Sequence, residues 1–163
     1  MAQLSSFDVV SDFDAQEFRN ALDQTQREIA TRFDLKSTGT TIEHKGDELT
    51  IVTDSEATLR SVHDVLESKL IRRSLSLKIL DYGEEEPASG GKTRQIVKLR
   101  KGIPEDLAKQ VTKRIRDEFK KVTPQIQGDA IRVQAKNKDD LQAVIAALKT
   151  ADYPVALQFT NYR

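Results

Sequence analysis

Residues 124–145 read PQIQGDAIRVQAKNKDDLQAVI. Apolar and polar residues alternate on both sides of a Gly-Asp pair, which is typical of two antiparallel strands joined by a tight hairpin turn. Asn137 then precedes apolar residues at helical spacing, so a helix is expected to begin there with Asn137 as its N-cap. The stretch therefore predicts strand, turn, strand and helix, with Arg132, Lys136 and Lys138 around the last junction.

The same order of elements occurs 82 residues upstream. Residues 41–53 alternate around a second Gly-Asp pair, and apolar residues at helical spacing follow from about residue 56 to 70. Five apolar positions coincide at this offset: Leu49 with Ile131, Ile51 with Val133, Leu59 with Leu141, Val62 with Val144 and Leu66 with Leu148. This agreement indicates a tandem duplication.

Each copy is completed by a strand and a helix before this stretch and by a strand after it. The added elements are first strands at 5–11 and 94–100, helices that begin near Asp14 and Pro104, and last strands at 74–80 and 156–161. The order β-α-β-β-α-β predicts an α+β fold with two tandem ferredoxin-like units, each a four-stranded antiparallel sheet with both helices on one face.

The boundary between the two units is expected near the run GEEEPASGGK at residues 83–92. Its acidic, proline and glycine residues show no periodicity, so it is interpreted as a linker or a long hairpin loop. This gives one unit at residues 1–91 and a second at residues 92–163.

Charge is divided unevenly between these two halves. Residues 1–91 hold 10 Lys/Arg and 18 Asp/Glu, which gives −8, and residues 92–163 hold 16 and 8, which gives +8. The asymmetry indicates either an anionic partner for the second half or attraction between the halves.

Composition excludes several classes of protein. The chain has 163 residues, 37% of them apolar and none of them cysteine, so disulfides and thiolate metal sites are ruled out. No apolar run approaches the ~18 residues of a membrane span, and no secretory signal is recognisable, so we expect a cytoplasmic protein without a membrane partner.

Strand alternation defines the open face of the second sheet, opposite its helices. With the strand at 94–100 in this sheet, the open face carries three cations, four amides, one hydroxyl and no carboxylate: Lys98, Arg100, Arg132, Gln125, Gln127, Gln134, Gln158 and Thr160. Arg and Lys suit phosphates and amides suit base edges, although an open face is polar in any case. The face lacks the central aromatics on which RNA-recognition motifs stack bases.

A bound phosphate is expected between Arg132 and Lys136, with Lys138 nearby and with Gln125 and Gln127 selecting among bases. Asp139 and Asp140 occupy the start of the helix and so compete with an anion there.

No motif indicates catalysis or a cofactor. GGKT at residues 90–93 lacks the first glycine of a P-loop and precedes a strand instead of a helix. His44 and His63 have no partner at metal-ligand spacing. We expect a protein that is not an enzyme and that has neither cofactor nor metal.

Four segments resemble the YajQ family of small bacterial proteins: SFDVVSDFD at 6–14, REIATRFDLK at 27–36, IQGDAIRVQAKNKDDLQAVI at 126–145 and LQFTNYR at 157–163. The resemblance spans nearly the whole chain. It implies nucleotide binding, with cyclic di-GMP as the ligand of some members and a link to nucleic acid in others. Leu35 stands where the family usually has a second Phe, which removes an aromatic from any cyclic dinucleotide site near RFDLK.

The resemblance also implies that the two units exchange their first strands. Lys98 and Arg100 would then belong to the sheet of the first half, and the open face of the second sheet would gain Asp8 and Val10 in their place.

The predicted function is non-enzymatic binding of a phosphorylated nucleotide or nucleic acid by a basic sheet surface. The alternative is a protein-interaction module that docks a partner on the less polar first sheet. For Arg132→Ala, the prediction is weaker ligand binding with an almost unchanged melting temperature.

Overall fold

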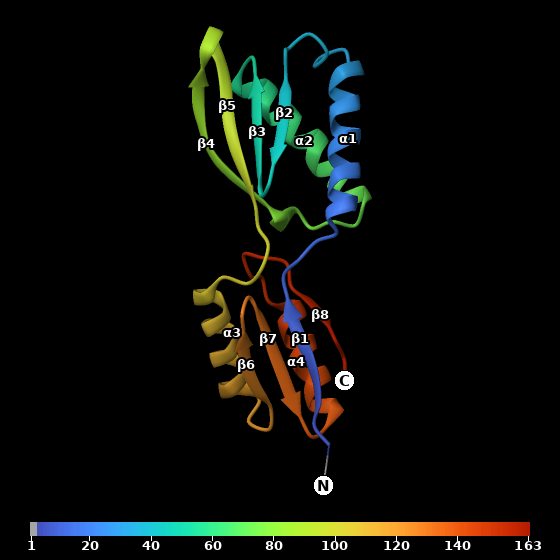
Figure 1. The fold of residues 1–163 in the computed structure, drawn as a ribbon, viewed down its shortest axis with the longest axis vertical. Coiled ribbons are helices and arrows are strands. Elements are labelled where there is room, and N and C mark those ends of the chain that lie inside the picture. The colour runs from blue at the N-terminus through green and yellow to red at the C-terminus, as the bar shows by residue number, and fades with distance from the viewer. Residues whose placement is uncertain (1–2) are drawn as a thin grey trace. The chain divides into compact units, whose positions relative to one another are not determined.

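The computed structural model describes residues 3–163, and Figure 1 shows its two sheets, each with helices packed on one face. The strands are β1 Ser5–Val10, β2 Thr41–Lys45, β3 Glu48–Thr53, β4 Leu80–Ala88, β5 Lys92–Leu99, β6 Thr123–Gln127, β7 Ala130–Ala135 and β8 Gln158–Thr160. The helices are α1 Ala15–Thr31, α2 Glu56–Arg72, α3 Glu105–Glu118 and α4 Lys138–Thr150, with short 3-10 turns at Leu77–Ile79 and Ser89–Gly91. The predicted α+β fold of two ferredoxin-like units is confirmed.

The chain forms two compact units that are not consecutive in sequence. Residues 13–100 form one, called here the inserted unit, and residues 1–12 with 101–163 form the other, called here the terminal unit. Each has its own apolar core, around Leu49 and Leu66 in the inserted unit and around Phe7 and Val144 in the terminal unit. The predicted division between residues 91 and 92 is therefore replaced by divisions near residues 12 and 100.

The first strands are exchanged between the sheets. The sheet of the terminal unit has the order β6-β7-β1-β8, with β1 antiparallel to both neighbours, as Figure 1 shows. The sheet of the inserted unit has the order β2-β3-β5-β4, with β5 in the equivalent position. Each sheet has its central antiparallel pair made from segments far apart in the sequence.

The segment from residue 74 to residue 92 differs from the prediction. Residues 74–79 are not a strand: Ser74 has a left-handed φ of 60°, and a 3-10 turn follows before β4 begins at Leu80. The predicted linker or hairpin loop belongs to the long β4–β5 hairpin, whose turn lies at Ser89–Gly91. An ion pair of 3.2 Å joins Glu86 Oε2 to Arg94 Nη2 across this hairpin. Glu85 and Glu86 are therefore paired strand residues, whereas Glu84 lies at the register shift between Tyr82 and Glu85.

The helix starts follow from local chemistry. Asp14 Oδ1 accepts hydrogen bonds from the backbone N–H groups of Gln16 and Glu17, and Asn137 Oδ1 accepts one from Asp139. These side chains satisfy backbone donors that have no partner within the helix. The N-cap predicted at Asn137 is confirmed, and α1 and α3 begin directly after Asp14 and Pro104, as predicted.

The charge asymmetry of the two halves largely disappears in the folded units. The terminal unit holds 12 Lys/Arg and 10 Asp/Glu, a net charge of +2, and the inserted unit holds 14 and 16, a net charge of −2. The exchange causes this change, because residues 92–100 carry four cations into the inserted unit and residues 1–12 carry two carboxylates out of it. Binding of an anion therefore depends on local clusters of charged side chains and not on the net charge of a whole unit.

Candidate functional site

The open face of the terminal unit's sheet is polar, as predicted, but its composition differs. Ile131 and Val133 are fully buried, so Arg132 between them lies on the opposite face. Strand pairing places Gln125 of β6 and Asp8 of β1 on either side of Arg132. The face contains a carboxylate at its centre, which the unexchanged arrangement lacked.

Arg132 is held by this carboxylate. Its Nε lies 3.0 Å from Asp8 Oδ1 and its Nη2 lies 3.4 Å from Asp8 Oδ2, which also accepts a hydrogen bond of 2.9 Å from Asn161 Nδ2. Asp8 is only 8% exposed. The hydrogen bond from Arg132 lowers the pKa of Asp8, against the opposing effect of burial, so the pair is ionised at neutral pH. Asp8 thus occupies Nε and Nη2 of Arg132 and competes with a phosphate for this guanidinium.

Lys98 and Arg100 do not belong to this face, because they lie at the end of β5 in the inserted unit. Arg100 is bound there: its Nη2 lies 3.3 Å from Asp81 Oδ1, and its Nη1 donates to the carbonyl oxygens of Lys78 and Leu80. Lys98 is paired in register with Glu48 and Asp81. The predicted surface of three cations on one sheet is wrong, and the physical reason is the strand exchange.

Lys136 lies at the end of β7, beside a hollow of about 740 Å³ that we call the junction hollow. Its lining combines two lysines, two amides and a hydroxyl with one carboxylate and two apolar side chains: Lys121, Lys136, Gln134, Asn137, Thr123, Asp140, Leu4 and Ala135. Pockets for small ligands have volumes of about 300–1,000 Å³, so the junction hollow is large enough for a nucleotide.

Lys121 is the residue that sequence reasoning missed. It precedes β6, whose pairing with β7 sets Thr123 opposite Gln134. Extending this register by two residues brings Lys121 to the level of Lys136, so the hairpin places the two ammonium groups at the same end of the sheet. The alternation around the Gly-Asp turn already contained this register, and the lysine pair at 120–121 was the available signal.

Lys138 belongs to a different hollow. This second hollow, of about 310 Å³, is lined by Ser5, Ser6, Lys138, Leu141, Gln142, Ile145, Tyr162 and Arg163. The predicted cluster of Arg132, Lys136 and Lys138 is therefore divided in three: Arg132 is bound to Asp8, and each lysine lines a hollow of its own. Gln125 and Gln127 are exposed on β6, as predicted.

Among residues 3–163, no group of three or more His, Asp or Glu side chains is arranged to hold a metal ion. None of the helices in this described range is both long enough and apolar enough to cross a membrane.

Comparison with known proteins places this arrangement in a family. A family model described as "Nucleotide-binding protein YajQ-like" matches residues 5–163. Proteins named "Nucleotide-binding protein" from Thermosynechococcus vestitus and Trichormus variabilis are 61% and 60% identical over 163 residues, which is 100% of each chain. A protein of the same name from Chloroflexus aggregans is 59% identical over 161 residues, 98% of each chain. The chain belongs to the YajQ family.

Proposed function

We propose that this chain binds phosphorylated nucleotides or short single-stranded nucleic acid, and that Lys121 and Lys136 in the junction hollow meet the phosphates. The names of its relatives support nucleotide binding in general. The observation that supports this location is that two lysines line one hollow, with two side-chain amides beside them. Within the described part of the chain, neither lysine forms an ion pair, so both ammonium groups are available.

The rest of the junction hollow suits the remainder of a nucleotide. Gln134 and Asn137 each carry an amide, which can both donate to and accept from a base edge. Leu4 is 54% exposed and offers an apolar surface on which a base or sugar can rest. Asp140 opposes phosphate at the helix start, so the phosphates are expected near Lys121, away from the first turn of α4.

Longer ligands would extend from the junction hollow onto the sheet. Gln134 lies on β7, and Gln125 and Gln127 lie on the adjacent strand β6, so their amides continue the polar surface. A cyclic dinucleotide or an oligonucleotide would contact these amides, while a mononucleotide would not. Lys138 would add a phosphate contact only for a ligand that also enters the second hollow.

The experiment is a binding titration with ATP, GTP, cyclic di-GMP and a short single-stranded RNA, preceded by a thermal-shift screen. For a single strand, log K is expected to fall with log salt at about −0.7 per phosphate contact, so two lysines contribute a slope of about −1.4 between about 50 and about 200 mM salt. The double variant Lys121→Gln/Lys136→Gln is expected to lose this part of the slope and about tenfold in affinity.

The matched pair is Lys121→Gln and the control Lys120→Gln, because each removes one charge at adjacent positions and only Lys121 lines the junction hollow. Equal losses in Lys120→Gln and Lys121→Gln would show a general electrostatic effect and contradict the assignment. If no ligand changes the melting temperature, and binding partners are proteins whose affinity is insensitive to salt, the alternative of a protein-interaction module is correct.

A further inference from the structure

The loop between α1 and β2 presents an aromatic ring to solvent. Phe33 is 87% exposed, more than any other large apolar residue in the described range. Burying a Phe side chain stabilises a fold by removing apolar surface from water, and the exposed Phe33 ring contributes almost none of this stabilisation. An aromatic ring held outside the core is therefore a candidate for contact with a ligand.

Contacts within the loop hold Phe33 in its exposed position. Two residues later, Leu35 is 2% exposed and anchors the loop in the core, while its backbone N–H and that of Lys36 donate to the Arg32 carbonyl oxygen at 3.0 and 2.8 Å. A chain of hydroxyls at 2.6 and 2.8 Å then links Thr38 through Thr40 to the buried Thr53 of β3. Such bonding orders the loop before any ligand arrives, which lowers the entropic cost of binding.

The charged groups around the ring favour an anion. Lys36 Nζ lies 5.4 Å from the centroid of the Phe33 ring, on one face of it, and with 87% of the residue exposed the other face is left to solvent. The nearest carboxylate in sequence, Asp34, is bound to Arg32 Nε at 2.7 Å. Lys36 has no ion pair within residues 3–163, so its charge is not neutralised.

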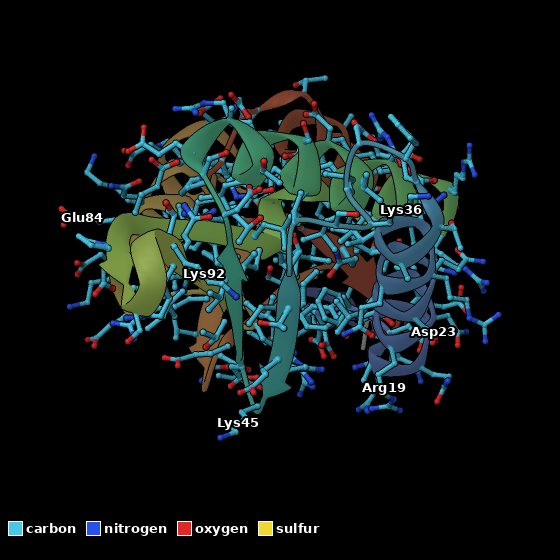
Figure 2. All side chains as sticks on the ribbon, turned by 90° about the horizontal axis from the view of Figure 1, so that it is seen from above. Arg19, Asp23, Lys36, Lys45, Glu84 and Lys92 are labelled. Atoms are coloured by element: carbon cyan, nitrogen blue, oxygen red, sulfur yellow. The ribbon has the colours of Figure 1, made fainter. Side chains whose placement is uncertain are left out.

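Lys36 also lines a hollow of about 570 Å³ beside the loop. The lining includes the hydroxyls of Thr40 and Thr41, the amide of Gln26, which donates to the Ile42 carbonyl oxygen, and the carboxylate of Glu43. Lys36, which lies near α1 in Figure 2, is the cation over the Phe33 ring, while Lys92 Nζ lies beside Gly39, another residue that lines the hollow. Hydroxyls beside a lysine suit a sugar and its phosphate.

We propose that Phe33 is a stacking platform for a nucleobase, which rests on the open face of the ring while Lys36 meets the phosphate of the same nucleotide. An exposed cation–π contact is weak, so Lys36 can leave the ring at small cost. Stacking is tolerant of sequence because every base has a π-face. This site lies in the inserted unit and shares no residue with the junction hollow.

The test uses the full chain and two fluorescent probes: 2-aminopurine riboside triphosphate and a short single-stranded RNA with one 2-aminopurine. Stacking quenches the fluorescence of 2-aminopurine, so the wild-type protein is expected to quench at least one probe. The probe that is quenched shows whether the stacked base belongs to a free nucleotide or to a single strand. Phe33→Ala is expected to remove the quenching and to weaken binding about tenfold, and Phe33→Tyr is expected to retain both.

Lys36→Gln is expected to weaken binding and make it less sensitive to salt, whereas Lys45→Gln, on β2 and well apart from Lys36 in Figure 2, is expected to have no effect. An unchanged melting temperature of Phe33→Ala checks that its exposed ring does not support the fold.

The inference is overturned if neither probe is quenched, or if Phe33→Ala binds and quenches as the wild type does. It is also overturned if Lys45→Gln weakens binding as much as Lys36→Gln. If Lys121→Gln/Lys136→Gln loses binding and Phe33→Ala does not, the nucleotide binds at the junction hollow and the proposed role of Phe33 is wrong.

Discussion

The two sheets have the same topology but differ at the centre of their open faces. In the terminal unit, β7 and β1 place Arg132 opposite Asp8, and these residues form a bidentate ion pair. At the equivalent position in the inserted unit, β3 and β5 place Thr50 opposite Ile96, which carry no charge. The duplicated fold therefore supports a charged pair in one copy and a neutral pair in the other.

This difference shows that the exchanged strands decide the chemistry of each face. The cation of the ion pair comes from residue 132 and the carboxylate from residue 8, far apart in the sequence. A surface that appears basic within one half of the sequence is neutralised by a strand from the other end of the chain. The cations that we propose for a ligand lie away from the centres of the open faces: Lys121 and Lys136 in the terminal unit, and Lys36 in the inserted unit.

The inner faces of the two sheets differ as well, and the largest expected effect comes from there. Phe7 of β1 is fully buried against Phe159, with ring centroids 6.0 Å apart. We expect Phe7→Ala to lower the free energy of unfolding by about 3–5 kcal/mol, because it removes a large ring from a packed core. Hydrogen exchange followed by mass spectrometry should show the greatest loss of protection in β7 and α4.

The matched variant for the other sheet is Gln95→Ala, because Gln95 pairs with Ile51 as Phe7 pairs with Val133. Gln95 is 4% exposed, its Oε1 is 2.6 Å from His63 Nε2, and its Nε2 donates to the Gly83 carbonyl oxygen at 2.8 Å. We expect a smaller loss of about 1–3 kcal/mol, from buried polar groups left without partners, with protection lost mainly in β3. Equal loss of protection in both sheets for either variant would contradict the separation of the two cores.

A third effect concerns the ion pair and depends on pH. Arg132→Ala leaves the nearly buried Asp8 without its cation, so the melting temperature at pH 7 is expected to fall by a few degrees. The sequence alone predicts an almost unchanged melting temperature, because it does not pair Arg132 with Asp8. In the wild type the folded-state pKa of Asp8 is lowered, so this stabilisation is present above the unfolded pKa of about 3.9 and is lost as pH falls through the folded pKa. In the variant, burial favours the protonated acid.

The difference in melting temperature between wild type and Arg132→Ala should therefore shrink as pH is lowered from 7 toward about 3, as measured by thermal melts at both ends. Gln127→Ala, an exposed change on the neighbouring strand, serves as the control and should alter neither value. A deficit that stays constant with pH would show that Arg132 acts by packing and not through Asp8.

Most of the fold could be predicted from the sequence because its signals are local. The helix starts at Asp14 and Asn137, and the hairpin at Gly128, depend on side chains within a few residues. The segment at residues 83–92 is harder to predict, since Glu85 and Glu86 form strand pairs only when β5 lies alongside. The strand exchange could be predicted only from the family resemblance, because the spacing of the strands along the sequence is the same in the exchanged and unexchanged arrangements.

The candidate sites could be predicted only in part. Lys136 was expected, and the strand register explains why Lys121 joins it. Arg132 was assigned to phosphate because its partner Asp8 lies 124 residues away and belongs to the strand that is exchanged. The exposure of Phe33 has no periodic signal, because loop residues between α1 and β2 follow neither helical nor strand alternation.

The most direct test of the central claim is a nuclear magnetic resonance titration of the isotope-labelled full chain with the nucleotide that raises its melting temperature most. The account predicts that backbone amides of residues 121–123 and 134–140 shift together and saturate at one affinity, and that those shifts disappear in Lys121→Gln/Lys136→Gln. A nucleotide that binds and saturates without moving these amides would contradict the account.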